Sequence, residues 1–380
     1  MKVVHILQGF SGGTSTYICT VLPELVKKGF DVTLICSVNH YCHDATGRIS
    51  KLRETGVKIH IVPMRREINL LKDIRSFALI LRLLSKHKFD IVHTHCSKAG
   101  ALGRVAAFLT GRKVRIHSPH CFAFLRCDGR LRKSLYLGLE KMLGRLTTIL
   151  VAVSQSEAAV ALRSGIVPSH KCISVRNGLS NGQRLPERDV PKRESAPKTA
   201  LGLDRDTQVV ATACRLVEYK GVFRFLRAAE LSRAQKTVFL MAGDGELKIL
   251  AERFICNNRL SDKVRLLGHV SNMEKVYSVS DIVTLCSDAE AQPYLLLEAM
   301  RAKCPIIATS VIGNEELISH NTTGFLTEPT PASIADAVDE LLGSKDKRHQ
   351  YAENAYAYFC RHHTLKRQIA ELTRIYNSST

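Results

Sequence analysis

The feature that most constrains the fold of this chain is a regular alternation of short β-branched runs with helical stretches. The first half holds these runs at Val3–Leu7, Val32–Cys36, Val57–Val62, Ile91–His95, Val114–Ser118 and Ile149–Val153. Such apolar runs are typical of strands buried on both faces, as in a parallel sheet whose connecting helices cover both sides. The alternation therefore predicts an α/β fold with a doubly wound parallel sheet.

The alternation stops in a polar, proline-bearing stretch and then resumes. The second set of runs is Val209–Cys214, Thr237–Met241, Val264–Leu267, Ile282–Leu285, Ile306–Thr309 and Gly324–Leu326. We therefore predict two Rossmann-like domains, at residues 1–178 and 201–359, joined by a linker at 179–200. Because ligands bind at the carboxyl ends of parallel strands, two such domains that face each other would form a binding cleft.

Charge is distributed unevenly between the two halves. Residues 1–180 carry 28 Lys and Arg against 10 Asp and Glu, a balance of +18, whereas residues 181–380 carry 27 and 25, a balance of +2. The excess favours an anionic partner for the first half, either nucleic acid or an acidic membrane face, although a basic surface without a partner is the simpler reading. Nucleic acid is disfavoured because aromatic residues are only 6%, Trp is absent and no aromatics interleave with basic residues.

Cysteine usage and hydropathy indicate the compartment. None of the 12 cysteines forms a C-x-x-C pair, which is typical of a reduced, cytosolic protein. No apolar run approaches the roughly 18–20 residues of a membrane span, so we expect a protein that is soluble or sits on a membrane without crossing it. One stretch suits membrane contact: residues 126–145 form a basic amphipathic helix, whose apolar stripe fits a domain core equally well.

The segments that follow the strands carry the candidate binding residues. After the first strand, Gly12 and Gly13 lead into a helix, so the backbone can approach an anion at the helix N-terminus. Their spacing is not the G-x-G-x-x-G fingerprint, and a plain tight turn fits as well. After the fifth strand comes His120, and a lone His is more often structural than functional.

In the second half, charged side chains follow two strands. Arg215 and Lys220 lie at a strand end beside a helix start and suit a diphosphate, although solvated surface charge explains the pair equally well. Gly243 lies in a second glycine-bearing turn, whose simpler reading is a strand-to-helix turn capped by Asp244.

Two glutamates follow a later strand. Glu290 lies in the loop and Glu298 about one turn inside the next helix. Carboxylates accept hydrogen bonds from paired sugar hydroxyls, and the helix start at Tyr294 and Leu295 can offer N–H groups to a phosphate. Together with the two cations, these residues predict a sugar-diphosphate site.

In their order along the chain, these motifs resemble family 4 of the retaining glycosyltransferases, which have the GT-B architecture. The ordered set is Gly12-Gly13, His93–Gly100, His120, Val151–Ser156, Asn177-Gly178, Arg215 to Gly221, Gly243–Gly245 and Glu290 to Met300. It spans essentially the whole chain. Two further pieces, Ser97–Gly100 with Gly103-Arg104 and Pro119–Phe124, resemble the branch that builds bacterial surface polysaccharides on polyprenyl-diphosphate lipids.

The resemblance implies a role for each strand-end residue. Arg215 and Lys220 would hold the donor diphosphate, Glu298 the ribose and Glu290 the hydroxyls of the transferred sugar. His120 would sit at the reacting sugar. The implied catalytic set is His120, Arg215, Lys220 and Glu290. The implied donor-binding set is Gly12, Gly13, Arg215, Lys220, Gly243, Glu290, Tyr294, Leu295 and Glu298.

The implied reaction transfers a sugar from a nucleotide-sugar with retention of the anomeric configuration, and it needs no metal or other cofactor. Two cationic side chains and helix N-termini would neutralise the leaving diphosphate instead. The acceptor would be a polyprenyl-diphosphate-linked or other glycan at the inner face of the cytoplasmic membrane, where the basic first domain would bind as a peripheral protein. The helical tail at about 360–380 would pack back on that domain.

Four departures from the family pattern and one alternative function stay open. Ala291 and Lys303 stand where the family usually has Gly, Ser15 where it often has Glu, and Ser180 where it normally has Asp. Together these departures leave the donor sugar undetermined. A sugar-nucleotide epimerase with the same two domains is the alternative within this fold. The spacing of the two glutamates and the cationic pair favour the transferase.

Overall fold

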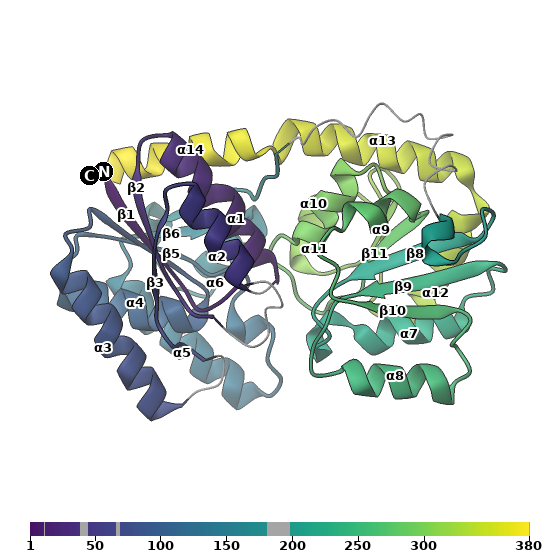
Figure 1. Cartoon of the computed structure of the whole chain (residues 1–380), viewed down its shortest axis with the longest axis horizontal. Helices are drawn as coiled ribbons and strands as arrows, with labels where there is room; N and C mark the ends of the chain where they lie inside the picture. The colour runs from purple at the N-terminus through teal and green to yellow at the C-terminus, as the bar shows by residue number, and fades with distance from the viewer. Residues whose placement is uncertain (11, 39–44, 66–68, 181–197, 380) are drawn as a thin grey trace. The chain divides into compact units, whose positions relative to one another are not determined.

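The structure is a computed structural model that describes residues 1–10, 12–38, 45–65, 69–180 and 198–379. These residues form two units, each built on its own parallel sheet (Figure 1). Unit 1 comprises Met1–Gly178 and Leu365–Thr380, and unit 2 comprises Leu179–Thr364. Most of the predicted linker falls outside the described residues. Among the described helices, none is both long and apolar enough to cross a membrane.

The sheet of unit 1 has the strand order β3-β2-β1-β4-β5-β6-β7, and every pairing is parallel. The strands are β1 Lys2–Leu7, β2 Asp31–Cys36, β3 Lys58–Ile61, β4 Ile91–His95, β5 Val114–Ser118, β6 Ile149–Ala152 and β7 Cys172–Ser174. All residues of β4 are buried, as expected for a strand covered on both faces. The doubly wound sheet is confirmed. The sequence does not predict β7, because three half-buried residues are too few to form a pattern.

Helices cover both faces of this sheet, with α3, α4 and α5 on one side and α1, α2 and α14 on the other (Figure 1). The bounds are α1 Gly12–Lys27, α2 Ala45–Glu54, α3 Leu70–Lys86, α4 Ser97–Leu109, α5 Arg130–Leu146, α6 Gln155–Arg163 and α14 Leu365–Ser379. The sequence pattern predicts the start of α1 at Thr16. The helix in fact begins at Gly12, so both strand-end glycines lie in its first turn.

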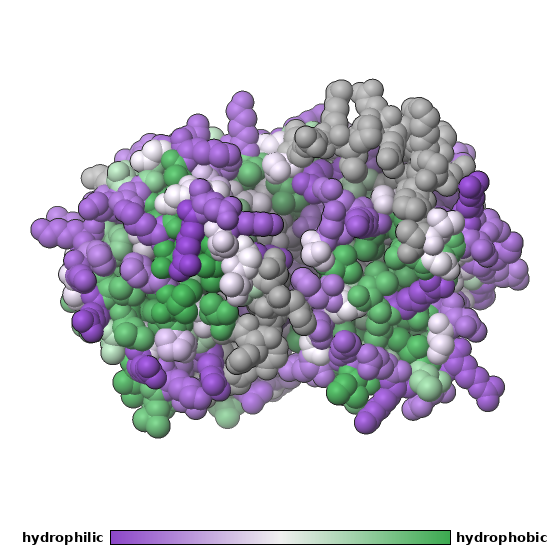
Figure 2. Space-filling view, viewed as in Figure 1, coloured by the Kyte–Doolittle hydropathy of each residue, from purple (hydrophilic) through white to green (hydrophobic). Residues whose placement is uncertain are grey.

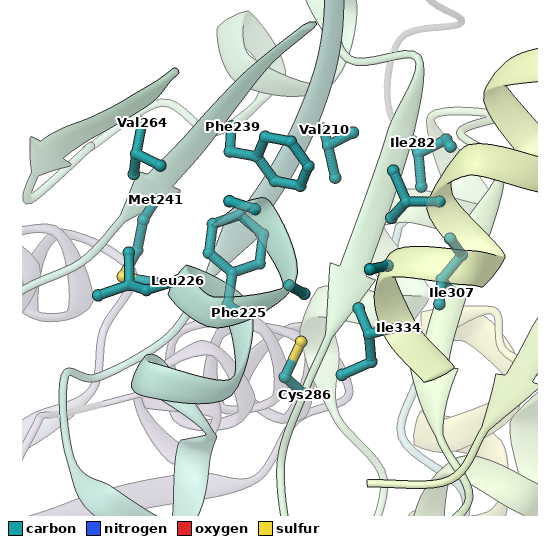
Figure 3. Close-up of a cluster of buried hydrophobic side chains, with 14 of the residues drawn as sticks. Val210, Phe225, Leu226, Phe239, Met241, Val264, Ile282, Cys286, Ile307 and Ile334 are labelled. Atoms are coloured by element: carbon teal, nitrogen blue, oxygen red, sulfur yellow. The ribbon is translucent and has the colours of Figure 1, made fainter. Parts of the chain in front are cut away.

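The sheet of unit 2 has the order β10-β9-β8-β11-β12-β13 and is also parallel. The strands are β8 Gln208–Ala213, β9 Thr237–Ala242, β10 Val264–Gly268, β11 Ile282–Leu285, β12 Ile306–Thr309 and β13 Phe325–Thr327. Its core is shown in Figure 3, where side chains from the strands meet those from α7 (Val222–Leu231) and α12 (Pro331–Gly343). The second predicted sheet is thereby confirmed.

The remaining helices of unit 2 are α8 Lys248–Asn257, α9 Glu274–Val279, α10 Tyr294–Arg301, α11 Ile312–Leu317 and α13 Lys345–His362. The sequence pattern does not predict α9 and α11, because six residues are too few to show a helical repeat of apolar positions. Both short helices nevertheless position residues of the candidate site, as described below.

In each sheet the strand order reverses once, between β1 and β4 in unit 1 and between β8 and β11 in unit 2. At such a switch point the connections leave toward opposite faces, and ligands of open α/β sheets bind at the carboxyl ends of the strands there. The predicted site residues follow β1 and β5 in unit 1, and β8, β9 and β11 in unit 2.

Candidate functional site

Two loops at the switch point of unit 2 are joined by a buried ion pair. Lys220 ends the turn that follows β8, and Glu290 lies in the loop after β11. The Lys220 ammonium donates to Glu290 Oε1, and the two side chains are 18% and 8% exposed. Burial lowers the pKa of Lys220, but the Glu290 carboxylate and Tyr219 together outweigh burial and raise this pKa above its ordinary value. Lys220 is therefore charged at neutral pH.

A second cation, Arg215, lies in the same loop. Its Nη2 donates to the Tyr219 hydroxyl at 2.5 Å. The Tyr219 ring centre lies 6.0 Å from the Arg215 guanidinium carbon and 5.3 Å from the Lys220 ammonium, so the ring is close to both cations. Within the described part of the chain, Arg215 forms no ion pair. A half-buried guanidinium without a carboxylate partner is suited to bind a phosphate.

Glu298 in α10 is oriented by a tyrosine from α9. The Tyr277 hydroxyl donates to Glu298 Oε2 at 2.6 Å. Burial and the nearby Glu298 carboxylate raise the pKa of Tyr277 well above its ordinary value, so the phenol keeps its proton. Because α10 begins at Tyr294, the predicted Tyr294 and Leu295 form its first turn, and no side chain caps this N-terminus.

Two glycines hold the loops of this site close together. Gly243 has a φ of 133°, and a Cβ there would collide with the Cys214 carbonyl, so glycine lets the turn after β9 approach the residue before Arg215. Gly313 lies in the first turn of α11, and a Cβ there would lie 2.6 Å from the Glu290 carbonyl oxygen. Gly313 therefore helps to set the position of the Glu290 loop.

In the turn after β9, the structure differs from the sequence prediction for Asp244. Asp244 does not cap the next helix, because α8 begins only at Lys248 and has no side-chain cap. Its carboxylate instead accepts from the Gly245 N–H at 2.7 Å, within the same turn.

Unit 1 contributes the other predicted residues. Gly12 and Gly13 are exposed in the first turn of α1, which contains no acidic residue to compete with an anion. His120 follows β5 with a φ of 53°, and its Nε2 lies 3.0 Å from His95 Nδ1. Burial lowers the pKa of His120 to about 3, so its ring is neutral at neutral pH.

Comparisons with known proteins identify the family. Residues 11–180 match the model of glycosyltransferase family 4, and residues 195–358 match the model of the group 1 glycosyl transferases. A galactosyltransferase of Escherichia coli that acts on GlcNAc-diphosphoundecaprenol is 30% identical over 86% of this chain and 84% of its own length. The chain belongs to the family 4 glycosyltransferases.

Other relatives of this glycosyltransferase agree with that membership. The capsular polysaccharide biosynthesis glycosyltransferase CapM of Staphylococcus aureus is 25% identical over 87% of this chain and 85% of its own length. The crystal structure of HepE from Anabaena in complex with UDP and glucose superposes with a TM-score of 0.83, covering 100% of both chains at 18% identity. This likeness confirms the GT-B fold.

Ala291 and Lys303 are two of the expected departures from the family pattern, and the structure describes the surroundings of both. Ala291 is 7% exposed beside Glu290. Lys303 has a φ of 54°, in the left-handed region that favours the glycine usual there. Its ammonium pairs with Glu353 of α13 at 2.8 Å and lies 4.8 Å from the centre of the Tyr356 ring. These contacts offset part of the backbone strain.

Sequence reasoning misses three residues that shape the site, namely Tyr219, Tyr277 and Gly313. In the sequence, Tyr219 stands between the two predicted cations, Arg215 and Lys220. That position is the signal in the sequence that could have indicated its place in the site. Tyr277 and Gly313 belong to the two unpredicted short helices, so no pattern connects them with the glutamates that they contact or adjoin.

Proposed function

We propose that this glycosyltransferase moves a sugar from a nucleotide-sugar to a lipid-linked or oligosaccharide acceptor in the synthesis of a bacterial surface polysaccharide. By their names, the Escherichia coli relative uses UDP-Gal and a diphosphoundecaprenol acceptor, and the Staphylococcus aureus relative acts in capsule synthesis. HepE has been solved with UDP. These relatives favour a uridine diphosphate sugar as the donor.

The observation that carries the proposal is the arrangement of Arg215, Lys220 and Glu290 at the switch point of unit 2. Arg215 has no carboxylate partner among the described residues, and Lys220 has one. A bound diphosphate would attract both cations, so we infer that Lys220 turns from Glu290 to the phosphate. The Glu290 carboxylate would then accept hydrogen bonds from hydroxyls of the transferred sugar. Glu298, oriented by Tyr277, would accept from the ribose hydroxyls.

We further propose that the transfer retains the anomeric configuration and needs no metal. The two cations would stabilise the charge that develops on the leaving diphosphate, which is the role a metal ion has in other enzymes. A donor phosphate oxygen would take the proton of the acceptor hydroxyl. Glu290 and His120 are poorly suited to that step, because Glu290 would accept hydrogen bonds from the sugar and burial lowers the pKa of His120 to about 3.

A thermal-shift screen against UDP-, GDP-, ADP- and TDP-sugars tests the donor. We expect a rise in melting temperature with UDP-sugars alone, because a ligand that binds only the folded state stabilises it. The stabilising sugar is then offered with a polyprenyl-diphosphate-linked acceptor, with and without EDTA, and the anomeric configuration of the product is read by NMR. Stabilisation by no nucleotide-sugar contradicts the proposed function, and loss of transfer in EDTA contradicts metal independence.

We also propose that unit 1 rests on the anionic inner face of the cytoplasmic membrane. One row of α5 is apolar and exposed, with Leu131 at 85%, Leu135 at 69% and Met142 at 53%, while Leu143 is buried. Arg and Lys side chains flank this row, and residues 1–180 carry the balance of +18. Figure 2 shows further hydrophobic side chains at the surface around the end of α3, on the same side of the sheet. Apolar side chains ringed by cations suit an anionic bilayer.

Vesicle sedimentation tests this membrane proposal. We expect the protein to bind anionic vesicles, to bind them less at high salt, and not to bind neutral vesicles. The variant L131S/L135S should lose most of this binding. L231S, which removes a similarly exposed leucine from unit 2, is the control and should bind like the parent chain. Equal binding to both kinds of vesicle, or to neither, rules out the proposal.

A further inference from the structure

A line of buried polar side chains crosses the interior of unit 1 and ends at His120. His93 and His95 lie two residues apart on β4 and so share one face of the sheet, and His5 on β1 pairs with His93 in register. Tyr376 reaches the same place from α14, 283 residues away from His93 in the sequence. Apart from His120, every member is fully enclosed.

Consecutive hydrogen bonds join these side chains, which we call the histidine chain, from His120 through His95, His5, Tyr376 and His93 to Ser118. Taken in that order, the donor–acceptor distances are 3.0, 2.9, 3.4, 2.7 and 2.9 Å. Beyond its last member, the Ser118 hydroxyl donates to the Val151 carbonyl at 2.8 Å. The histidine chain therefore ends on a group that can only accept.

That end fixes the direction of the neighbouring hydrogen bonds. Ser118 has one hydroxyl proton and gives it to the Val151 carbonyl, so its oxygen must accept from His93 Nε2. A neutral imidazole has one N–H group. His93 Nδ1 is therefore an acceptor and receives the proton of the Tyr376 hydroxyl.

The same reasoning continues back to the other end. The Tyr376 oxygen accepts from His5 Nε2, which leaves His5 Nδ1 to accept from His95 Nε2. His95 Nδ1 then accepts from His120 Nε2. At every ring the proton sits on Nε2, and His120 retains an unprotonated Nδ1. Among the described residues, His120 Nδ1 has no hydrogen-bond partner.

This assignment of the ring protons requires that all four imidazole rings are neutral, and burial favours the neutral form. It lowers the pKa of His5 and of His120 to about 3 and takes those of His93 and His95 well below the ordinary value of 6.5. Burial also raises the pKa of Tyr376, so its hydroxyl keeps the proton that it donates.

The backbone that carries His120 is held in place as well. His120 and Cys121 both have positive φ, of 53° and 77°. The Cys121 N–H donates to Glu157 Oε1 at 2.6 Å, and the other oxygen of that carboxylate accepts from the Val153 N–H at 2.9 Å. A buried carboxylate thus pins the strained turn to α6, which keeps the His120 ring in one place.

We propose that the histidine chain fixes His120 in the Nε2–H tautomer, so that its Nδ1 accepts a hydrogen bond from a hydroxyl of the sugar substrate. His120 then recognises a neutral hydroxyl through an unprotonated ring nitrogen. Ser118 and Tyr376 are positioning residues that act through the chain. The identity of the hydroxyl rests on the proposed function, whereas the tautomer does not.

A bound metal is the competing explanation for these rings, since ligand atoms of His5, His93 and His95 lie within 4.8 Å of one another. The His5 Nδ1 to His95 Nε2 distance of 2.9 Å is that of a hydrogen bond between the rings. Each of these two nitrogens already has the other as its partner. The geometry therefore favours hydrogen bonds between the rings over a metal site.

Long-range 1H–15N NMR of the full chain labelled with 15N-histidine tests the tautomer, because it separates a protonated from an unprotonated ring nitrogen. We expect His120 to show Nε2–H alone, with its signals assigned from the spectrum of H120Q. His117 is an internal reference: Thr94 donates to the Ile116 carbonyl at 3.2 Å, so its oxygen accepts from His117 Nδ1 at 3.0 Å and His117 has the opposite tautomer. A proton on His120 Nδ1, or a stoichiometric metal in the purified protein, overturns the proposal.

Two variants test whether the histidine chain sets that tautomer. S118A removes the hydroxyl that fixes the direction of the hydrogen bonds in the histidine chain. Y376F removes the hydroxyl that links His5 with His93, and it is the variant to use if S118A does not fold. In either variant we expect both tautomers at His120, an unchanged His117 and a fall in kcat of about 10-fold. An unchanged His120 tautomer in a folded variant overturns the role of the chain.

Adding the UDP-sugar from the thermal-shift screen tests the hydroxyl contact. We expect the His120 Nδ1 signal to move when the donor binds. If the donor binds and that signal stays in place, the hydroxyl contact is overturned and the tautomer is not. If no nucleotide-sugar binds, the proposed function has failed, and the tautomer result stands or falls on the unliganded spectrum.

Discussion

The two units of this glycosyltransferase each contain a buried ion pair, and these two pairs differ in what can reach them. In unit 1, Arg104 of α4 pairs with Glu140 of α5 at 2.9 Å, with side chains 0% and 5% exposed. In unit 2, Lys220 pairs with Glu290 at the strand ends, and the side chains are 18% and 8% exposed. The first pair is enclosed between helices, whereas the second opens toward the edge of the sheet where ligands bind.

In this molecule, most of the net charge and the charged candidate donor-binding residues lie in different units. Residues 1–180 carry almost all of the net charge, yet the histidine chain in the interior of unit 1 is neutral. Residues 181–380 are nearly balanced, yet they place Arg215 and Lys220 at a switch point. Under the proposed function, the overall charge of unit 1 would serve a surface partner, and the local charges of unit 2 would bind the donor.

The largest effect that follows from the comparison is on transfer. K220A should lower kcat by about 1,000-fold, because it removes a cation that stabilises the leaving diphosphate. K236A removes an exposed lysine from the same unit and should change kcat little. Assays at saturating donor measure both.

Loss of folding in K220A is separated from loss of chemistry by a double variant. K220M/E290Q removes both charges and leaves no unpaired carboxylate in the site, so it should melt close to the parent temperature and still fail to transfer. Near-normal kcat in K220A or in the double variant removes the pair from the mechanism.

The enclosed pair of unit 1 should show the reverse behaviour. E140Q leaves the Arg104 guanidinium buried without its carboxylate, so we expect the free energy of unfolding to fall by about 3 kcal/mol. Its kcat, measured below the unfolding transition, should stay within about twofold of the parent value. Urea unfolding and the transfer assay together check this, and an E140Q protein of parental stability would contradict the structural role.

An exposed pair gives the smallest effect. Lys303 and Glu353 are each 38% exposed, so their ion pair contributes little, while the left-handed backbone at Lys303 costs stability. K303G should therefore raise the free energy of unfolding by up to about 1 kcal/mol. K303A keeps the strain and loses the pair, so it should be less stable than K303G. The opposite order in thermal or urea unfolding would show that the contacts to α13 matter more than the backbone.

The strands of both sheets could be predicted because each is a run of apolar, β-branched residues, and such runs have few other ways to be buried. The nearness of Lys220 and Glu290 could be expected because their loops follow the neighbouring strands β8 and β11, whereas the roles of Arg215, Lys220 and Glu290 stay predictions. Because neighbouring parallel strands end at the same edge of a sheet, the side chains that follow them come close together even when they are far apart in the sequence. That is why the Lys220–Glu290 contact, across 70 residues, agrees with a site inferred from loops.

Other contacts in the structure could not be derived from the sequence. Tyr277 belongs to a six-residue helix that shows no periodicity, and its contact with Glu298 depends on where that helix lies. The spacing of His93 and His95 places them on one face of β4, but nothing in the sequence connects them with Tyr376 in the C-terminal helix. Arg104, part of the resemblance to polysaccharide enzymes, has a packing role with Glu140 that the motif does not reveal.

The central claim is that the strand ends of unit 2 bind the diphosphate of the donor, and calorimetric titration with UDP tests it most directly. R215Q removes the guanidinium that has no carboxylate partner among the described residues, whereas R227Q removes the same charge from an exposed position on α7. We predict that R215Q weakens UDP binding by at least about 10-fold, since a charged hydrogen bond contributes about 1.5–3 kcal/mol. R227Q should bind UDP like the parent chain. Equal UDP affinity in R215Q and R227Q would contradict the account.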